Sequence, residues 1–125
     1  MSQAGAECVF CDVRAPLAQN RVAFAILDRY PVSPGHVLIV PKRHIGSFFD
    51  TTADERSGML DLLFELKLRT DVELAPDGYN IGVNIGQAAG QTVMHVHMHL
   101  IPRVRGDMNN PRGGVRGVIP AKQNY

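Results

Sequence analysis

The residues best suited to chemistry are three histidines, His95, His97 and His99, at alternate positions in one apolar run. The positions between and after them are apolar: Val96, Met98 and Leu100. A period of two is typical of a half-buried strand, because successive side chains of a strand point to opposite faces. At a rise of about 3.3 Å per residue, neighbouring imidazoles would lie roughly 6.6 Å apart. The pattern predicts a strand with one face in the core and a row of imidazoles on the other.

Such a row suits phosphoryl chemistry. Neutral imidazole is a good nucleophile toward phosphorus, and hydrolysis of the resulting phosphoramidate splits one difficult displacement into two easier ones. Imidazole also suits the supporting roles of charge stabilisation and proton transfer, because its pKa of about 6.5 is close to the working pH. His97 has a histidine on either side, and we therefore predict that it is the nucleophile.

The segment before the histidines is consistent with a site that faces phosphate. Gly86 and Gly90 permit close approach of backbone N–H groups to an anion. Asn84 precedes this loop, Gln91 and Thr92 follow it, and all three side chains are neutral hydrogen-bond donors. We predict that the loop contacts phosphate.

A metal site is the rival interpretation of the histidines. Two histidines at i and i+2 on a strand can share one zinc ion, which would make a bound water the nucleophile. Cys8 and Cys11, in the sequence Cys-Val-Phe-Cys, are compatible with a redox pair, a disulfide or half of a zinc site. The redox pair lacks a neighbouring βαβ pattern, the disulfide is disfavoured in a reducing compartment, and the zinc site needs two more ligands.

Composition narrows the class of protein. A chain of 125 residues, 45% hydrophobic and 20% charged, predicts a single domain with a proper core. A net charge of +1 argues against a general nucleic-acid binder. No apolar run approaches the ~20 residues of a membrane span, and residues 1–7 lack the features of a signal peptide. We therefore expect a cytoplasmic protein with no membrane partner.

The remaining chain supplies elements to position these residues. We predict strands over 21–28 and 36–41, joined as a hairpin by a Pro/Gly-rich turn, and a third strand over 79–85. A helix starts near Thr52, which forms a capping-box pattern with Glu55, and stops at 76–78. Its apolar residues are predicted to pack in the core: Met59, Leu60, Leu62, Leu63, Phe64, Leu66 and Leu68. Residues 1–20 are expected to be irregular, and the order of elements favours an α+β fold.

Four segments resemble the histidine triad (HIT) family. They are His95–Ile101, with the pattern His-φ-His-φ-His-φ-φ, together with Pro34–Ile45, Ala89–Val93 and Cys8–Cys11. The resemblance covers residue 8 to about 105. It implies a five-stranded antiparallel sheet with one long helix and a shorter one. It also implies a homodimer in which helices and sheets continue across the two-fold axis. The whole of 1–125 would be one HIT domain, with an irregular zinc-binding segment at 1–20 and a basic tail at 103–125.

The resemblance also implies a role for each residue. His97 would attack the α-phosphate of a nucleotide derivative, and His99 would hydrogen-bond that phosphate. Asp28 would bind ribose hydroxyls, and His36 would lie near the triad. Contacts to the phosphates would come from Asn84, Gln91 and Thr92. In members with the cysteine pair, zinc is held by Cys8, Cys11, His44 and His95. Such a four-ligand set has no position for water and is structural.

The resemblance favours a hydrolase, because the family's nucleotidyl transferases have glutamine where this chain has His99. The C-terminal residues are similar to those of a bacterial branch related to dinucleoside polyphosphate hydrolases. The expected substrate is a dinucleoside polyphosphate or a nucleoside phosphoramidate. The alternatives are a nucleotide-binding interaction module with vestigial activity and a zinc-dependent metallohydrolase. The basic residues of the tail face one acidic residue, Asp107, and would reach a polyphosphate leaving group, the other subunit or solvent: Arg103, Arg105, Arg112, Arg116 and Lys122.

Overall fold

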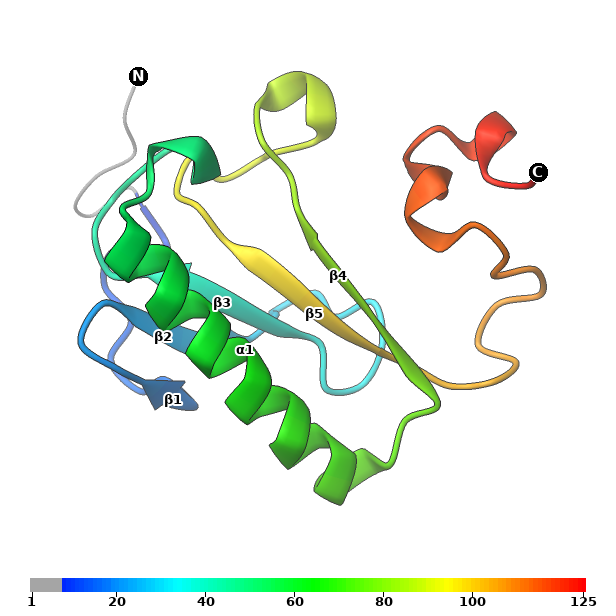
Figure 1. The fold of residues 1–125 in the computed structure, drawn as a ribbon, viewed down its shortest axis with the longest axis horizontal. Helices are drawn as coiled ribbons and strands as arrows, with labels where there is room; N and C mark the ends of the chain where they lie inside the picture. Colours follow the sequence, from blue (N-terminus) through cyan, green and yellow to red (C-terminus); the bar gives the residue numbers. More distant parts are fainter. Residues whose placement is uncertain (1–7) are drawn as a thin grey trace.

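A five-stranded antiparallel sheet crossed by one long helix forms the framework of the computed structural model, which describes residues 8–125 (Figure 1). The spatial order of the strands is β1-β2-β3-β5-β4. This architecture confirms the α+β prediction. The elements are β1 (Ala18–Gln19), β2 (Ala23–Leu27), β3 (Val37–Pro41), α1 (Ala53–Leu74), β4 (Gly78–Val83) and β5 (Met98–Arg103).

The sequence missed one strand of the sheet. β1 lies inside the segment 1–20 that was expected to be irregular, and it pairs with β2 through only two residues, Ala18 opposite Ala25 and Gln19 opposite Phe24. Two residues are too few to show a period of two, so the strand exists because β2 offers an edge. The other three predicted strands correspond to β2, β3 and β4 with ends shifted by a few residues.

The histidine run is only partly a regular strand. β5 begins at Met98, so His95 and His97 precede the hydrogen-bonded ladder, and the prediction of three histidines on one strand is wrong in that respect. In this stretch the Val96 backbone N–H donates to the Ile45 carbonyl oxygen at 2.8 Å. The apolar members pack in the core under the helix, as the alternation predicts: Val96, Met98 and Leu100. Burial itself does not alternate, because His95 and His97 are buried as well.

The long helix starts as predicted. The Thr52 side chain accepts from the Glu55 backbone N–H, and the Glu55 side chain accepts from the Thr52 N–H, which completes the capping box. The helix ends at Leu74, after which Ala75 takes a left-handed conformation with φ of 45°. The shorter helix is represented, among residues 8–125, by 3₁₀ segments: Phe48–Asp50, Gln87–Ala89, Gly114–Val118 and Pro120–Lys122.

Only one stripe of the helix enters the core. The residues that pack against the sheet are Met59, Leu62, Leu63 and Leu66. Leu60, Phe64 and Leu68 were predicted to widen the buried stripe, but they are 47%, 70% and 64% exposed. The prediction failed because the sheet covers only one side of the helix, so residues turned away from it have no protein partner in the single chain.

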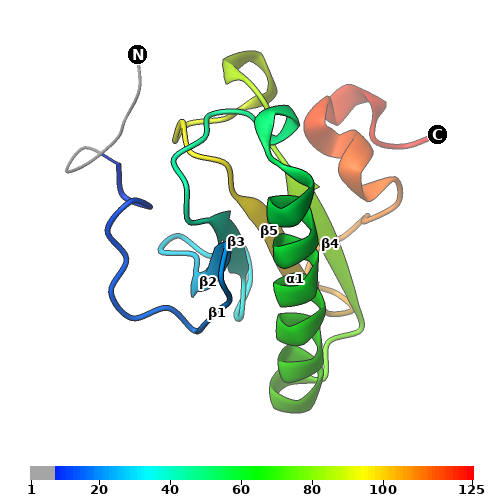
Figure 2. The same cartoon turned by 60° about the vertical axis from the view of Figure 1, so that its left-hand side comes forward.

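The two faces of the sheet have different coverings. The helix covers one face, and the segment from Cys8 to Leu17 crosses the other, as the side view shows (Figure 2). A second, smaller core lies under this segment: Cys8, Phe10, Phe24, Leu38 and Val40. Helix and sheet approach closely at Gly58, where an added Cβ would overlap the Val22 side chain and where the Asn20 side-chain amide donates to the Gly58 carbonyl at 2.9 Å.

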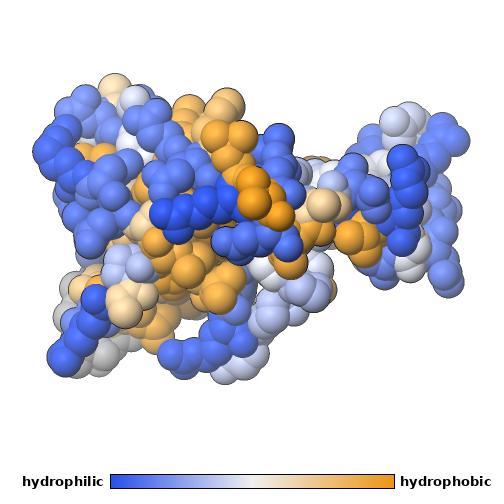
Figure 3. Space-filling view, turned by 90° about the horizontal axis from the view of Figure 1, so that it is seen from below, coloured by the Kyte–Doolittle hydropathy of each residue, from blue (hydrophilic) through white to orange (hydrophobic). Residues whose placement is uncertain are grey.

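The residues after β5 lie beside β4 and stand away from the body of the molecule (Figures 1 and 3). Hydrophobic surface is gathered over the body rather than over this tail in Figure 3. Within the described part of the chain, α1 and the other helical segments are too short or too polar to cross a membrane.

Candidate functional site

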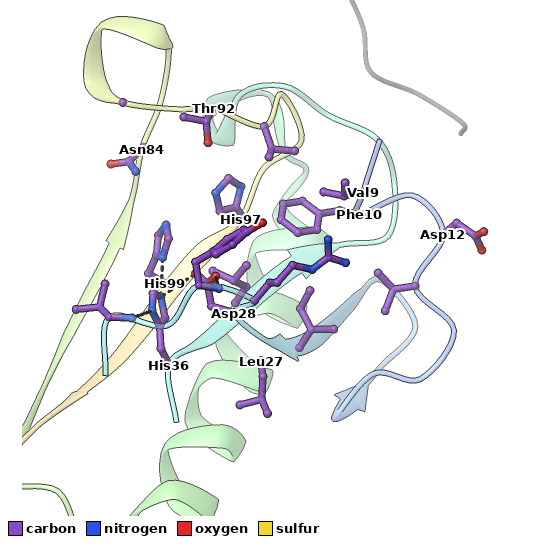
Figure 4. Close-up of a pocket in the computed structure, with 18 residues that line it drawn as sticks. Val9, Phe10, Asp12, Leu27, Asp28, His36, Asn84, Thr92, His97 and His99 are labelled. Carbon is purple, nitrogen blue, oxygen red and sulfur yellow. Dashed lines mark hydrogen bonds and ion pairs between the residues drawn. The ribbon is translucent and has the colours of Figure 1, made fainter. Parts of the chain in front are cut away.

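A cavity of about 760 Å³ opens on the sheet face opposite the helix (Figure 4). It brings together six residues that the sequence analysis singled out: Asp28, His36, Asn84, Thr92, His97 and His99. They come from the end of β2, the start of β3, the end of β4 and the segment that runs into β5. Residues far apart in the chain therefore meet because the antiparallel order places these strand ends side by side.

Hydrogen bonding fixes the ring proton of His97. Its Nδ1 lies 2.9 Å from the backbone carbonyl oxygen of His95. A carbonyl oxygen only accepts, so Nδ1 carries the proton and the neutral ring has its free lone pair on Nε2. The ring is buried, lies 5.1 Å from the Phe10 ring between centroids, and is part of the cavity lining. The neutral form of His97 is thus held in one tautomer, with its Nε2 lone pair available.

A second chain of hydrogen bonds orders His36 and His99. The Val32 backbone N–H donates to His36 Nδ1 at 3.0 Å, so the proton of neutral His36 sits on Nε2. That N–H donates to His99 Nδ1 at 2.9 Å, and Asp28 Oδ2 lies 3.4 Å from the same nitrogen. His99 must then carry its own proton on Nε2. His97 therefore offers a lone pair at Nε2, whereas His99 offers a proton there.

The electrostatics favour neutral rings for this pair. Burial lowers the pKa of His99 to about 4, helped by the neighbouring His97 and His36 and opposed by Asp28. Burial also lowers the pKa of His36, against the Asp28 carboxylate, which raises it. Both pKa values lie below the ordinary value near 6.5, so both rings are neutral at pH 7.

The group of Asp28, His36 and His99 has ligand atoms within 4.8 Å of one another, as a metal site would. Its hydrogen bonds argue for a different role. A metal on His36 Nε2 would move the ring proton to Nδ1, where it would meet the Val32 N–H donor. The hydrogen bonds of these three residues therefore fix the ring protons of His36 and His99, and they do not favour a bound cation.

A different cluster fits a metal. Ligand atoms of Cys8, Cys11, His44 and His95 all lie within 4.8 Å of one another. Cys8 Sγ is 3.3 Å from His95 Nδ1, Cys11 Sγ is 3.2 Å from His44 Nδ1, and the two Nδ1 atoms are 3.2 Å apart. A zinc tetrahedron with bonds near 2.3 Å to sulfur and 2.0–2.1 Å to nitrogen has edges of roughly 3.3–3.6 Å. The predicted Cys₂His₂ set is therefore typical of a zinc site.

The tautomer of His95 agrees with this role. Its Nε2 lies 2.8 Å from the Pro41 carbonyl oxygen, so Nε2 carries the proton and Nδ1 is free to bind the metal. Burial lowers the pKa of His95, which favours the neutral, ligating ring. Four protein ligands complete a closed site of the structural kind.

Phe10 is a site residue that the sequence analysis did not single out. It lies between the two cysteines, and its ring is 5.9 Å from that of His95 and 5.1 Å from that of His97, between centroids. It also lines the cavity, as Figure 4 shows. The signal was its position: a large apolar residue between two metal ligands must pack near the histidines that complete the set.

Gln91 is placed differently from its neighbours. It is buried and does not line the cavity, although it was expected to contact phosphate. Its side-chain oxygen accepts from the Gly86 N–H at 2.8 Å, and its Nε2 donates to the Gly46 and Val93 carbonyls at 2.8 and 3.1 Å. The side-chain oxygen and Nε2 of Gln91 thus both bond to backbone groups, and these bonds hold the loop that carries Thr92.

Comparison with known proteins identifies the family. The model of the HIT domain matches residues 16–106, which is most of the chain. The protein belongs to the HIT family. Curated HIT relatives include an uncharacterized 16.1 kDa HIT-like protein of Mycoplasma pneumoniae, 36% identical over 108 residues, which are 82% of this chain and 75% of that protein. The AP-4-A phosphorylase of Mycobacterium tuberculosis is 35% identical over 95 residues, 74% of this chain but 48% of that protein.

Solved HIT structures share the fold. A HIT family protein from Bacillus anthracis superimposes with a TM-score of 0.77 at 30% identity, over 86% of this chain and 78% of that one. A Zn-bound histidine triad family protein from Mycobacterium smegmatis has a TM-score of 0.73 at 35% identity, over 82% and 79% of the two chains. A zinc-bound relative of this similarity agrees with the Cys₂His₂ cluster of the present chain.

Proposed function

We propose that this HIT protein hydrolyses a nucleotide derivative, a dinucleoside polyphosphate or a nucleoside phosphoramidate, at its α-phosphate through a nucleotidyl intermediate on His97. One observation carries the proposal: the His95 carbonyl holds the proton of His97 on Nδ1, which leaves a neutral, nucleophilic Nε2 in a cavity of nucleotide size. The relative named AP-4-A phosphorylase supports a dinucleoside polyphosphate as one substrate class.

The first chemical step transfers the nucleotidyl group to the protein. The Nε2 lone pair of His97 forms a bond to the α-phosphorus, and the bond to the leaving oxygen or nitrogen breaks with its electron pair. A polyphosphate leaves as its anion, whereas an amine takes up a proton from solvent water as it leaves. Positive charge develops on the His97 ring and is stabilised by the His95 carbonyl at Nδ1. His99 Nε2–H donates to a phosphoryl oxygen.

Water completes the cycle. It attacks the same phosphorus, the bond to His97 Nε2 breaks, and a nucleoside monophosphate leaves. Because His99 stands where the family's transferases have glutamine, water is the proposed acceptor rather than a second substrate. A zinc ion held by all four residues of the cluster would have no open position for water, so we assign this chemistry to the histidines, and the ion would hold the chain just before β5.

The rest of the cavity suits a nucleotide. Asp28 stands at its rim, positioned by the Tyr30 backbone N–H that its Oδ1 accepts at 2.8 Å, and it is proposed to bind ribose hydroxyls. Asn84 and Thr92 are the proposed neutral donors to phosphate. The apolar part of the lining would receive the base: Val9, Phe10, Val13, Ile26 and Leu27.

A second copy of the chain is the proposed protein partner. Leu60, Phe64, Leu68 and Val72 repeat every four residues along α1 and form an exposed apolar stripe. β4 ends the sheet with a free edge, and Ile81 on it is half exposed. Packing of two stripes and pairing of two edges would cover both features in a homodimer.

Replacement of His97 by alanine tests the mechanism. We expect hydrolysis of diadenosine tetraphosphate and of adenosine 5′-phosphoramidate to fall by about 10⁴-fold, because no other group can form the bond to phosphorus. Acid-quenched wild-type protein should carry a nucleotide on the peptide that contains His97, detected by mass spectrometry. His97→Ala should keep its melting temperature and bind nucleotide. Turnover without the adduct, or turnover retained in the variant, would refute the mechanism.

A further inference from the structure

A second cavity, of about 490 Å³, lies next to the first, between β4, β5 and the tail. The two cavities share Val32, His36, Asn84 and His99, so they meet at the proposed reaction centre. We call the second one the tail groove, and its far walls are Asn80, Ile101, Met108, Val115, Val118 and Gln123. We propose that the tail groove binds the leaving nucleotide of a dinucleoside polyphosphate, an inference that rests on the proposed hydrolase function.

Gly82 lies in the wall of the tail groove and adds no side chain beside His99. This residue pairs with His99 across β4 and β5, so both face the same side of the sheet. A Cβ at Gly82 would meet nothing within 4 Å, and the backbone there is not in the left-handed region that requires glycine. The missing side chain therefore serves no need of the backbone and leaves room beside His99.

The walls of the tail groove fit a nucleobase better than a small amine. Ile101, Met108, Val115 and Val118 give apolar surfaces, of which Val115 and Val118 are exposed to the groove and solvent. Amide side chains lie among them at Asn80, Asn84 and Gln123. Asn80 Oδ1 accepts from Arg103, and Gln123 Nε2 donates to the Asn110 and Arg112 carbonyls, so the base edge would meet Asn84, Asn80 Nδ2 and Gln123 Oε1. A planar base needs both, apolar contact for its faces and amide groups for its polar edges.

Charge favours an anionic leaving group. Over residues 103–125 five cationic side chains accompany the single carboxylate of Asp107. Asp107 is occupied by Arg103, with hydrogen bonds of 2.8 and 2.7 Å. Arg112 and Arg116 lie over the Tyr125 ring, 4.8 and 4.7 Å from its centroid, beside the segment that forms the groove wall. Among residues 8–125 neither arginine forms an ion pair with an acid, and their charge would attract the phosphates of a leaving nucleotide.

The reaction places that nucleotide in the groove. When His97 Nε2 bonds to the α-phosphorus, the bridging P–O bond breaks and the departing nucleoside polyphosphate keeps the electron pair on its oxygen. The departing group would lie past His99 and Gly82, where the tail groove begins. An amine leaving group ends at the reaction centre and makes no contact with Val115 or Val118.

Two variants test the groove from opposite walls. Gly82→Val narrows the passage with a residue that strands favour, and Val115→Asp with Val118→Asp puts negative charge on exposed positions of the far wall. The measurement is the ratio of kcat/KM for diadenosine tetraphosphate to kcat/KM for adenosine 5′-phosphoramidate. We expect this ratio to fall by about tenfold in each variant. Ile119→Asp is the matched control, because Ile119 is exposed in the same tail but does not line the groove, and its ratio should stay within about twofold.

The outcomes separate the two proposals. If wild-type protein cleaves neither compound, the hydrolase function fails and the subsite fails with it. If wild-type protein cleaves both and the ratio is unchanged in both variants, the subsite is refuted while the hydrolase function stands. If the Val115 and Val118 changes abolish self-association and leave the ratio unchanged, the groove is a contact between copies of the chain and not a subsite.

Discussion

His97 and His99 are chemically identical side chains that present opposite groups to the cavity. The difference comes from the backbone: the His95 carbonyl accepts from His97 Nδ1, whereas the Val32 N–H donates to His36 Nδ1, so that His36 Nε2–H donates to His99 Nδ1 and the His99 proton sits on Nε2. Imidazole has one proton to share between two nitrogens, and each neighbour decides where it sits. The acceptor and donor roles of the two rings are thus set by main-chain atoms.

His99 should stay neutral well below the usual range of histidine. With a folded-state pKa of about 4 and an unfolded value near 6.5, its ring takes up a proton more readily in the unfolded chain between these limits. Its contribution to the free energy of unfolding is therefore complete above pH 6.5 and is lost as pH falls toward 4. Nitrogen-15 NMR of the ring should show a neutral Nε2–H tautomer at pH 6.

Two results would contradict this assignment: titration of His99 near pH 6.5, or a proton on its Nδ1. His99→Gln gives the matched comparison, because glutamine can still accept from His36 Nε2 but cannot titrate. The variant should lose less stability than the wild-type protein between pH 6.5 and pH 4.5, as measured by urea unfolding at the two pH values.

Residue types and spacing predicted many residues of the candidate site, but not the hydrogen bonds that orient them. The triad, the cysteine pair, Asp28 and Asn84 carry their chemistry in their identity, so the sequence located them. The Pro41 carbonyl that orients His95 is a backbone group, so no residue type in the sequence could predict this hydrogen bond. The partners of Gln91 were not predictable for a related reason: an amide suits three backbone groups as well as a phosphate, and its residue type does not distinguish the two.

At the scale of elements, the contact between α1 and the β1–β2 loop depends on one glycine. Gly58→Ala should destabilise the protein by about 1–3 kcal/mol, because the new methyl group would overlap Val22 and disturb the Asn20 hydrogen bond to the Gly58 carbonyl. Helix propensity alone predicts the opposite sign, a gain of about 1 kcal/mol. Urea unfolding decides between them.

Gly78→Ala is a control for this substitution, because a Cβ at Gly78 meets nothing within 4 Å. Its free energy of unfolding should stay within about 0.5 kcal/mol of the wild-type value. A Gly58→Ala protein as stable as wild type would show that the loop can move aside and that the close approach is not a constraint.

Elements that carry their own signals were predicted, and elements that depend on a partner were not. α1 has a capping box and a helical stripe within its own residues, so its start was located at Thr52. β1 has two residues and exists only against β2. The start of β5 was placed too early because the alternation continues through His95 and His97, where the chain bends and has no ladder partner on β3.

For the whole molecule, the exposed stripe on α1 predicts self-association. Phe64→Glu should convert the proposed homodimer to a monomer, because a carboxylate in an apolar contact loses its hydration without a partner. Sedimentation velocity measures the change. Val104→Glu makes the same substitution on another exposed surface and should leave the sedimentation coefficient unchanged. A wild-type monomer at tens of micromolar, or a dimer that tolerates Phe64→Glu, would contradict the proposed contact.

The sheet of this protein has a helix on one face and the histidines of the proposed reaction centre on the other. If the proposed function holds, substitutions that tune whether a phosphoanhydride or a phosphoramidate is accepted can accumulate in the β4–β5 surface and the tail without touching Met59, Leu62 or Leu66. Such a chain can diversify its chemistry while its folding thermodynamics stay constant. A survey of random variants should then divide into two nearly independent groups, those that lower expression and those that alter substrate preference.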